Sequence, residues 1–419
     1  MADRVQMLAA LLGTRWRRLG SREAVQRHQR RRLRRVLARA RRVFPYYSDV
    51  AFDQLAAFPV LDKASWLAGF EGLNDRGLSL DECLDAARAA EQRRSFDAEA
   101  SGLSIGLSSG TSGRQGVFLT SPAERARWAG VMLAKALHRL RDRARVALVL
   151  RSGGPLYQSV DGGRISFRYV DLALPPDAIA EQLHDFAPTI LAAPPQVLDD
   201  LAVRTPRLAP TVVYSIADVL DDEVAARVEA GLGVPVRQVY QATEGFLGIS
   251  CDHGTLHLNE DLIHVEREVI DEASGRFVPV ITDLYRRSQA IIRYRLGDVL
   301  VPGPANCPCG SPFAAIERVE GRADDVLRFT AATGESRPLF ADFVRTAVLG
   351  APVVEDFRLV QRADGSLRLA VRPQRAQASA HLALQGLLRS RGLLVPEIIG
   401  MPWPVEPPTA KRRRVRREG

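Results

Sequence analysis

The chain has 419 residues, of which 46% are hydrophobic, and a formal net charge of +9. This length is too great for one ordinary domain, so we expect two or three domains with substantial cores. No apolar stretch approaches the roughly 20 residues that span a bilayer, and the arginine-rich N-terminus lacks the apolar core of a secretory signal. Four cysteines are too few for a disulfide scaffold of this size. We therefore expect a globular, cytoplasmic protein.

The positive charge is concentrated in two short segments. Nine arginines and no acids lie between Arg27 and Arg42, and six cations with one acid lie between Lys411 and Glu418. The rest of the chain carries a net charge of −5, which argues against a nucleic-acid-binding body.

The first basic segment has the apolar spacing of an amphipathic helix. Such a helix would dock one face on the protein while its arginines stay solvated. The alternative is contact with nucleic acid or an acidic membrane, since clustered cations bind phosphates without reading sequence. The apolar residues at this spacing are Leu33, Leu37, Ala40 and Phe44.

The predicted elements begin with a basic helical region over residues 1–60 and continue as short strands that alternate with helices. Alternation at this spacing implies parallel pairing with crossover connections. The predicted strands are 103–107, 116–120, 145–150, 188–193 and 211–215, and the predicted helices are 122–141, 177–186 and 197–204. Two further strands, 356–361 and 366–371, flank the hairpin turn signal Asp364-Gly365.

The connection between the first two strands has the composition of a phosphate-binding loop. Glycines let the main chain approach an anion, and Ser, Thr and Arg side chains add donors and charge. A solvated linker is the other interpretation of such a run. The loop consists of Ser108, Ser109, Gly110, Thr111, Ser112, Gly113 and Arg114.

Further motifs follow in an order that is typical of one superfamily. They are Tyr240-Gln241-Ala242-Thr243-Glu244-Gly245, Arg293-Tyr294-Arg295-Leu296-Gly297-Asp298 and Gly321-Arg322-Ala323-Asp324-Asp325, with Phe58-Pro59-Val60-Leu61-Asp62-Lys63 before them and Cys307-Pro308-Cys309-Gly310 among them. On these motifs the chain resembles the adenylate-forming enzymes, which include the acyl-CoA synthetases. Within them it is most similar to the compact branch of phenylacetate–CoA ligases and deazaflavin-cofactor adenylyltransferases.

The resemblance implies an α/β fold with a large N-terminal, multi-sheet adenylation domain and a small, mobile α+β C-terminal domain. We place the N-terminal domain at residues 1–320, including the basic helical entry 1–60, and the C-terminal domain at residues 321–419. Asp324 matches the hinge position about which such enzymes move the C-terminal domain; a solvated loop is the other interpretation of the adjacent acids.

The resemblance also implies the roles of the residues that would hold ATP. The loop residues Ser108 to Arg114 would embrace the β- and γ-phosphates, with Arg114 where the family usually has lysine. Thr243 would donate to the α-phosphate, and the carboxylate of Glu244 would hold Mg²⁺, which prefers oxygen ligands. For an isolated Thr-Glu pair, the alternative is the N-terminus of a helix.

The nucleoside would be held by residues of several motifs. Tyr240 would lie against adenine, although a lone tyrosine is more often core packing. The segment Ser215 to Asp218, which contains Ala217, occupies the place of a family segment that passes along adenine. Asp298 would accept hydrogen bonds from both ribose hydroxyls, with Gly297 allowing the turn that aims it. Arg322 would reach the ribose or a phosphate.

Lys411 is the candidate for the C-terminal lysine that enters the adenylation site in this superfamily. It is the last of only three lysines, after Lys63 and Lys135. Its surroundings, Pro408 to Arg412, shorten the family pattern and lack its glycine, so a basic tail is the alternative.

Cys251, His257, Cys307 and Cys309 form a further constellation. Thiolates and an imidazole suit a tetrahedral Zn²⁺ ion of structural role, and the pattern resembles a metal site of some members of this branch. His253 is the rival fourth ligand, and buried free thiols are the alternative to a metal site.

The sequence thus predicts an enzyme that uses ATP and Mg²⁺ to adenylate a small carboxylic acid, with aromatic acids among the candidates, and then transfers the acyl group to CoA. One alternative is an adenylyltransferase that puts AMP on a hydroxyl of an aromatic cofactor, and an amine acceptor is also open. A different class of protein, associated with nucleic acid or membranes and carrying a degenerate nucleotide site, is the third interpretation.

Overall fold

The computed structural model describes all of the chain except residues 1, 18, 94, 96, 108–115, 138–142, 151–162, 206–207, 405–412 and 419. It describes only the main chain of residues 2, 324 and 342. The chain forms two compact units. The first comprises residues 1–269, 279–296 and 302–318, and the second comprises residues 270–278, 297–301 and 319–419.

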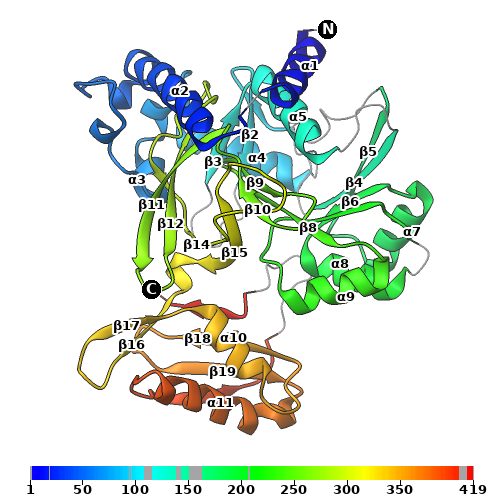
Figure 1. The fold of residues 1–419 in the computed structure, drawn as a ribbon, viewed down its shortest axis with the longest axis vertical. Helices are drawn as coiled ribbons and strands as arrows, with labels where there is room; N and C mark the ends of the chain where they lie inside the picture. Colours follow the sequence, from blue (N-terminus) through cyan, green and yellow to red (C-terminus); the bar gives the residue numbers. More distant parts are fainter. Residues whose placement is uncertain are drawn as a thin grey trace. The chain divides into compact units, whose positions relative to one another are not determined.

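Helices cover much of the N-terminal third and recur between the strands that follow (Figure 1). The α-helices are α1 (Ala2–Arg15), α2 (Arg22–Val43), α3 (Lys63–Ala68), α4 (Leu80–Gln92), α5 (Pro122–Ala136), α7 (Pro176–Phe186), α8 (Pro195–Arg204), α9 (Asp222–Leu232), α10 (Ala341–Leu349) and α11 (Gln377–Ser390). Short 3-10 helices are η1 (Pro45–Tyr47), η2 (Leu55–Ala57), η3 (Phe70–Leu73), η4 (Ala323–Asp325) and η5 (Gln374–Ala376).

The strands build one large mixed sheet and several small ones. They are β1 (Glu99–Ala100), β2 (Leu103–Leu107), β3 (Val117–Thr120), β4 (Ala144–Leu150), β5 (Ile165–Asp171), β6 (Ile190–Ala193), β7 (Val212–Ser215), β8 (Val236–Ala242), β9 (Gly245–Ser250), β10 (Leu256–Leu258), β11 (Ile263–Asp271), β12 (Arg276–Asp283), β13 (Tyr294–Arg295), β14 (Asp298–Pro302), β15 (Ala315–Arg322), β16 (Leu327–Thr330), β17 (Ser336–Leu339), β18 (Asp356–Gln361), β19 (Leu367–Arg372), β20 (Ile398–Met401) and β21 (Val415–Arg417).

The first unit contains a parallel sheet with helices on both faces, which confirms the predicted α/β class. Its strands pair in the order β5-β4-β6-β7-β8, and every pair is parallel. Leu191 and Val213 face the core shared with α7, α8 and α9, whereas Ile190 and Val212 face the core shared with α1 and α5. This alternation follows from the period of two along a strand.

The predicted elements of this region are confirmed as β2, β3, β4, β6, β7, α7 and α8. The helix predicted over 122–141 is shorter: α5 ends at Ala136, and Leu137 caps it in an extended conformation. Leu137 packs with Met7 and Leu12 of α1, so tertiary packing ends the helix before the sequence pattern does.

The helix α2 docks one apolar face, as its spacing predicts. Leu37, Ala40 and Phe44 are buried, whereas Leu33 is only half-buried. Most of the arginines stay exposed, namely Arg27, Arg30, Arg31, Arg34, Arg35 and Arg42.

A second core of the first unit supports the β2–β3 hairpin. Trp66 is 1% exposed and stacks on Phe118 of β3, with ring centroids 5.2 Å apart. Its indole Nε1 donates to the main-chain oxygen of Ala290 at 3.0 Å, and its ring meets the edge of Tyr294. The same core therefore holds both the strand that leaves the predicted phosphate loop and the Arg293–Asp298 motif.

The second unit contains a small α+β core of its own. The strands β18 and β19 form the predicted hairpin, in which Gly365 takes a positive φ of 84° that favours glycine. The sheet order is β20-β19-β18-β21, and α10 and α11 cover its apolar residues. Within the described ranges, no helix has the length and apolarity to cross a bilayer.

Candidate nucleotide site and thiol cluster

Thr243 and Glu244 are the two turn residues of a hairpin between β8 and β9. Ala242 pairs with Gly245 across them, so the alternative of a helix N-terminus is wrong. The Thr243 hydroxyl Oγ1 donates to Glu244 Oε2 at 3.0 Å. Glu244 is 9% exposed, so a buried carboxylate and a hydroxyl lie together at the end of a central strand.

Arg286 fixes this turn from the loop that follows β12. Its Nη1 and Nη2 atoms donate to the main-chain oxygens of Glu244 and Thr243, each at 3.4 Å. The guanidinium carbon also lies 5.9 Å from the ring centroid of Phe118 on β3. Arg286 therefore connects the Thr243–Glu244 turn to the strand that leaves the predicted phosphate loop.

Asp283, at the end of β12, shapes the same loop. Its Oδ1 accepts main-chain hydrogen bonds from Tyr285 at 2.7 Å and Arg286 at 2.8 Å. Burial raises the pKa of Asp283, an effect that the positive charge of Arg286 opposes. A Cβ at Gly245 would lie 3.7 Å from Asp283 Oδ2, so this carboxylate lies directly behind the turn.

Asp283 and Arg286 did not follow from the motifs. The sequence signal was an acid and two arginines, Arg286 and Arg287, between a strand and the Arg293–Asp298 motif. Only the fold shows that Arg286 turns toward residues that precede it by more than forty positions.

The predicted phosphate loop lies outside the described residues from Ser108 to Gln115, including Arg114. The strands on either side of it are described, and Leu107 pairs with Val117 at the base of the β2–β3 hairpin. The loop therefore starts and ends at this hairpin, whose second strand contributes Phe118 beside Arg286.

The predicted adenine segment follows β7. Because β7 and β8 are neighbouring parallel strands, their carboxyl ends lie at the same edge of the sheet. Ala217 takes a positive φ of 68°, which is rare for a residue with a Cβ. Asp218 Oδ2 accepts from Gln196 Nε2 at 3.2 Å. Ser215 Oγ is buried and has no hydrogen-bond partner among the described residues.

Tyr240 lies on β8 just before the Thr243–Glu244 turn. It is half-buried and packs against the core that contains Trp66 and Phe118. The register of β8 against β9 shifts between Tyr240 and Gln241, which marks a local irregularity beside the site.

Asp298 and Arg322 belong to the second unit and form an ion pair there. Arg322 Nη1 donates to Asp298 Oδ1 at 3.2 Å. A Cβ at Gly297 would lie 2.6 Å from Arg322 Nη2, so glycine makes room for the guanidinium at this position. Gly297 does not take the left-handed conformation that favours glycine, so the room that it leaves for Arg322 is the reason the structure gives for a glycine here.

The structure thus brings the predicted residues together in two sets. Thr243, Glu244, Tyr240 and Ala217 lie at one edge of the first unit, while Asp298 and Arg322 lie together in the second. Asp324 lies in η4 directly after Arg322, and only its main chain is described. Lys411 lies outside the described residues.

Four thiol and imidazole groups form a separate cluster in the first unit. The ligand atoms of Cys251, His257, Cys307 and Cys309 all lie within 4.8 Å of one another. The Cys251 and Cys307 sulfurs are 3.7 Å apart, and Cys309 Sγ lies 3.4 Å from His257 Nε2. His253, the rival ligand, is exposed and outside this cluster.

The cluster fits a zinc ion by its geometry. A tetrahedron with metal–sulfur bonds of about 2.3 Å has edges of about 3.8 Å, close to the two contacts observed. His257 Nδ1 faces the main-chain oxygen of Phe313 at 3.0 Å, which would fix the ring with Nε2 free to ligate. The main-chain N–H of Ser311 donates to Cys309 Sγ at 3.4 Å.

Neither protein-family models nor curated proteins match this chain. Solved structures do. A crystal structure of 2-hydroxyisobutyryl-CoA ligase in the postadenylation state, in complex with R3-HIB-AMP, matches with a TM-score of 0.65 and 16% identity over 94% of this chain and 89% of that chain. The open conformation of that ligase, in complex with 2-HIB-AMP and CoA, matches with a TM-score of 0.57 and 18% identity over 94% and 90% of the two chains.

A structure reported for the fatty acyl-adenylate ligases of E. coli and L. pneumophila matches with a TM-score of 0.51 and 13% identity, over 74% of this chain and 67% of that chain. The first two structures are of one CoA ligase bound to acyl-AMP compounds, and the third is of a fatty acyl-adenylate ligase. The chain therefore has the fold of these solved ligase structures, which is the fold that its motifs predict.

Proposed function

We propose that this protein is an adenylate-forming ligase that activates a small carboxylic acid with ATP and then passes the acyl group to CoA. The observation that carries the proposal is the contact of Arg286 with the Thr243–Glu244 turn, beside the strand that leaves the Ser/Thr/Gly-rich loop. The similar structures, which are CoA ligases and acyl-adenylate ligases, support it.

In the first half-reaction, a carboxylate oxygen of the substrate attacks the α-phosphorus of ATP, and the bond to the bridging oxygen of pyrophosphate breaks. The hydroxyls of Ser108 to Ser112 and the guanidinium of Arg114 would hold the leaving pyrophosphate. Thr243 Oγ1 would donate to an α-phosphate oxygen. Arg286 keeps the main chain of the turn in place, so only the Thr243 hydroxyl, which donates to Glu244 Oε2 here, has to turn toward the phosphate.

Glu244 is the residue that would hold Mg²⁺. Its buried carboxylate, with the Thr243 hydroxyl beside it, offers the hard oxygen donors that this ion prefers. The ion would neutralise charge on the phosphates.

Three residues are proposed for the nucleoside, namely Tyr240, Ala217 and Asp298. Tyr240 would lie against adenine, Ala217 and Asp218 would pass along its edge, and Asp298 would accept from the ribose hydroxyls. Arg322, which is paired with Asp298 here, would then be released toward the ribose or a phosphate.

In the second half-reaction, the thiolate of CoA attacks the acyl carbon and AMP leaves. We propose that residues 321–419 move about Asp324 between the two half-reactions and that Lys411 serves only the first. Lys411→Ala is then expected to slow adenylate formation about 100-fold or more, with little effect on thioester formation from preformed acyl-adenylate. Equal losses in both steps would remove Lys411 from this role.

The proposed function is tested by ATP–pyrophosphate exchange over a panel of aryl and short aliphatic acids. Wild type should support exchange with at least one acid, and Glu244→Gln should lower it about 100-fold or more. Glu229→Gln, the same change on the exposed face of α9, should leave it unaltered. Exchange that is equal in both variants would contradict the assignment.

Product analysis separates the acceptors. Acyl-CoA formed from acid, ATP and CoA supports the ligase. Pyrophosphate release with formation of an AMP-bearing product that requires a hydroxyl-bearing aromatic cofactor and no acid would instead indicate the adenylyltransferase. An amide formed from an added amine would indicate an amine acceptor. Salt-sensitive binding to nucleic acid without any exchange would favour the third interpretation.

We also propose that the cluster of Cys251, His257, Cys307 and Cys309 holds a structural Zn²⁺ ion. Its support is the tetrahedral spacing of four soft ligands, with the hydrogen bond of His257 Nδ1 as an outer contact. All four positions of a tetrahedral ion would be taken by the protein, which is the mark of a structural site.

A further inference from the structure

Three arginines from separate parts of the first unit converge on the ring of Tyr285. The guanidinium carbon of Arg127 on α5 lies 3.5 Å from the ring centroid, and that of Arg32 on α2 lies 4.0 Å from it. Arg17, between α1 and α2, lies at 5.8 Å. His28 Nε2 approaches the Tyr285 hydroxyl at 3.4 Å. We call Arg32, Arg127 and Tyr285 the arginine–tyrosine cluster.

The positive charge of this cluster is not balanced by the carboxylates around it. Arg17 is paired with Asp261 at 3.2 Å, and Lys135 shares the same carboxylate at 2.9 Å. Arg32 and Arg127 have no carboxylate within ion-pair distance of 4.0 Å among the residues that the structure describes. Asp283, whose charge acts on Arg127, already accepts two main-chain hydrogen bonds.

The same two arginines have buried N–H groups that find no acceptor in the part of the chain that the structure describes. These groups are Arg127 Nη2 and Arg32 Nε. Burial is the main cause that lowers the pKa of each guanidinium, and the charge of Arg17 lowers both further. Desolvated, mutually repelling cations with unused donors are costly, so an anionic ligand that accepts from these donors would recover free energy.

We propose that the arginine–tyrosine cluster is a binding site for a phosphate group. A guanidinium presents its N–H donors in a planar fork that matches the oxygens of phosphate. Two cations without counterions call for a dianion, which a phosphate or phosphate monoester supplies and a single carboxylate does not. The Tyr285 hydroxyl adds a donor at the same place.

The position of the cluster connects it to the proposed reaction. Tyr285 immediately precedes Arg286, which holds the Thr243–Glu244 turn, so both lie on one loop. Two sources of phosphate are therefore distinguished by the test: free phosphate, and the 3′-phosphate monoester of CoA. The second source rests on the proposed function, whereas the first does not.

The experiment is calorimetric titration of the full-length protein with inorganic phosphate at constant ionic strength, in a buffer free of phosphate and sulfate. Wild type should bind, and Arg127→Gln and Arg32→Gln should each weaken binding about tenfold or more, the loss expected from one charge-assisted contact. Arg31→Gln removes the same charge from an exposed position of α2 and should bind as wild type. Thermal unfolding of each variant checks that it folds. If Arg127→Gln does not fold, Arg127→Lys, which keeps the charge, is titrated in its place.

Two results would overturn the proposal. One is the absence of phosphate binding by wild type at millimolar concentrations. The other is binding that survives Arg127→Gln and is lost in Arg114→Gln, because the phosphate would then lie at the nucleotide loop. Since the titration needs no turnover, it gives its answer even if the protein supports no ATP–pyrophosphate exchange, and the two failures can be told apart.

A second titration identifies the source. If CoA places its 3′-phosphate here, Arg127→Gln should weaken CoA about tenfold while leaving dephospho-CoA unaffected. If the variant weakens inorganic phosphate alone, the site takes free phosphate. Both results support a phosphate site, and equal affinity of wild type and Arg127→Gln for all three ligands rejects it.

Discussion

Arg286 donates a hydrogen bond from Nη2 to the main-chain oxygen of Thr243, and its Nη1 reaches the next carbonyl along the chain. The two residues are forty-three positions apart, yet the pairing fixes the turn on which the proposed chemistry depends. The hydrogen bonds described between Arg286 and this turn go to main-chain oxygens, so we treat Arg286 as a positioning residue.

Arg286→Lys is expected to lower kcat for ATP–pyrophosphate exchange about 10–100-fold, with a smaller change in the KM for ATP. Lysine keeps the charge but has no planar fork, and a single ammonium cannot satisfy both carbonyls in the same way. The matched control is Arg287→Lys, at the adjacent position with an exposed side chain. A purely structural role would lower thermal stability and leave kcat per folded enzyme unchanged, and that result would contradict the prediction.

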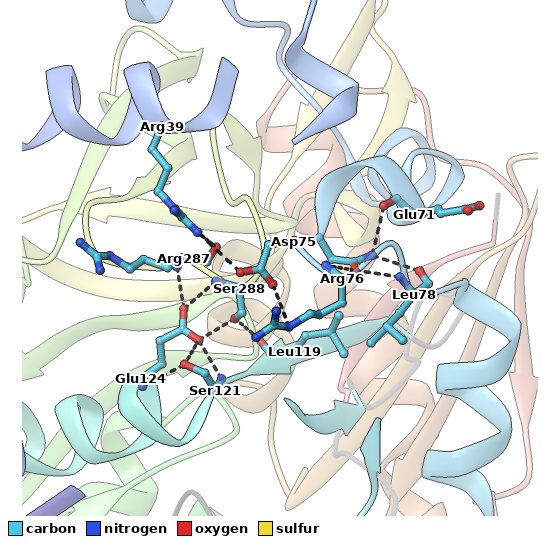
Figure 2. Close-up of polar contacts among 11 residues, drawn as sticks. Arg39, Glu71, Asp75, Arg76, Leu78, Leu119, Ser121, Glu124, Arg287 and Ser288 are labelled. Atoms are coloured by element: carbon cyan, nitrogen blue, oxygen red, sulfur yellow. Dashed lines mark hydrogen bonds and ion pairs between the residues drawn. The ribbon is translucent and has the colours of Figure 1, made fainter. Parts of the chain in front are cut away.

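Glu124 supports the same loop from the start of α5. Figure 2 shows its carboxylate between the loop residues Arg287 and Ser288 and the N-cap residue Ser121, whose main-chain N–H donates to it. The carboxylate accepts main-chain N–H groups from Ser121 at 2.7 Å, Arg287 at 2.6 Å and Ser288 at 3.0 Å. We expect Glu124→Ala to lower the free energy of unfolding by roughly 2–4 kcal/mol, because several donors lose a charged acceptor.

Urea denaturation at neutral pH measures this loss. Glu181→Ala, on the exposed face of α7, is the control and should change the free energy of unfolding by less than about 0.5 kcal/mol. Losses of equal size in the two variants would show that the contacts of Glu124 are not the cause.

The stability that Glu124 contributes should also depend on pH. Burial acts to raise the pKa of Glu124, but hydrogen bonds from Ser288, Arg287 and Ser121 outweigh it, so the pKa lies below its ordinary value. A carboxyl whose pKa is depressed by folding stabilises the protein above the unfolded pKa of about 4.3, and this stability is lost as the pH falls through the folded pKa. The difference in unfolding free energy between wild type and Glu124→Gln should therefore shrink below about pH 4. A difference that stays constant with pH would contradict this linkage.

Glu124 also shows where sequence reasoning stops. Local patterns predict β3 and α5, which flank and contain this residue. They also predict β4, because an apolar run such as 145–150 is typical of a parallel strand that is buried on both faces. The edge strand β5 has a half-buried pattern without such a run, and the sequence did not predict it. The link from Glu124 to Arg287 and Ser288 spans 163 and 164 positions, and no local rule contains it.

The site divides in the same way. The motifs predicted residue types suited to ATP, and the fold places Thr243 and Glu244 together at a strand end. Arg286 and Asp283 lie in no motif, because they act through contacts with main-chain atoms, which leave no residue pattern at the other end of the contact. The contact between the Arg322 guanidinium and Gly297 could not be predicted either. The close approach requires glycine, but the glycine does not indicate which residue lies against it.

Asp298 is expected to determine how tightly the ribose hydroxyls of ATP are bound. The carboxylate is paired with Arg322 at 3.2 Å, and the proposal is that ribose hydroxyls bind the same oxygens. Asp298→Ala should raise the KM for ATP about 10–100-fold, the cost of losing hydrogen bonds to a charged acceptor.

A double-mutant-type cycle makes this test specific for ribose: wild type and Asp298→Ala are each assayed with ATP and with 2′-deoxy-ATP. Wild type should use 2′-deoxy-ATP less well than ATP, whereas Asp298→Ala should treat the two nucleotides alike, because the partner of the hydroxyl is gone. If both enzymes discriminate equally against 2′-deoxy-ATP, Asp298 does not bind that hydroxyl.

The thiol cluster gives the last prediction. Cys307→Ser should abolish stoichiometric zinc, because three remaining ligands at these spacings leave an open tetrahedral position. It should also lower the midpoint of thermal unfolding, since binding free energy at a preformed structural site is folding free energy. Cys83→Ala is the matched control: this thiol is buried in α4 and lies outside the cluster, so the variant should keep its zinc. Elemental analysis of both proteins, grown with zinc and purified without chelator, measures the outcome. If wild type contains no zinc, or if Cys307→Ser and Cys83→Ala hold equal amounts of zinc, the four groups are packed thiols and imidazole.

His257→Gln provides the second measurement, because loss of zinc in that variant and not in His253→Gln would show which histidine is the ligand.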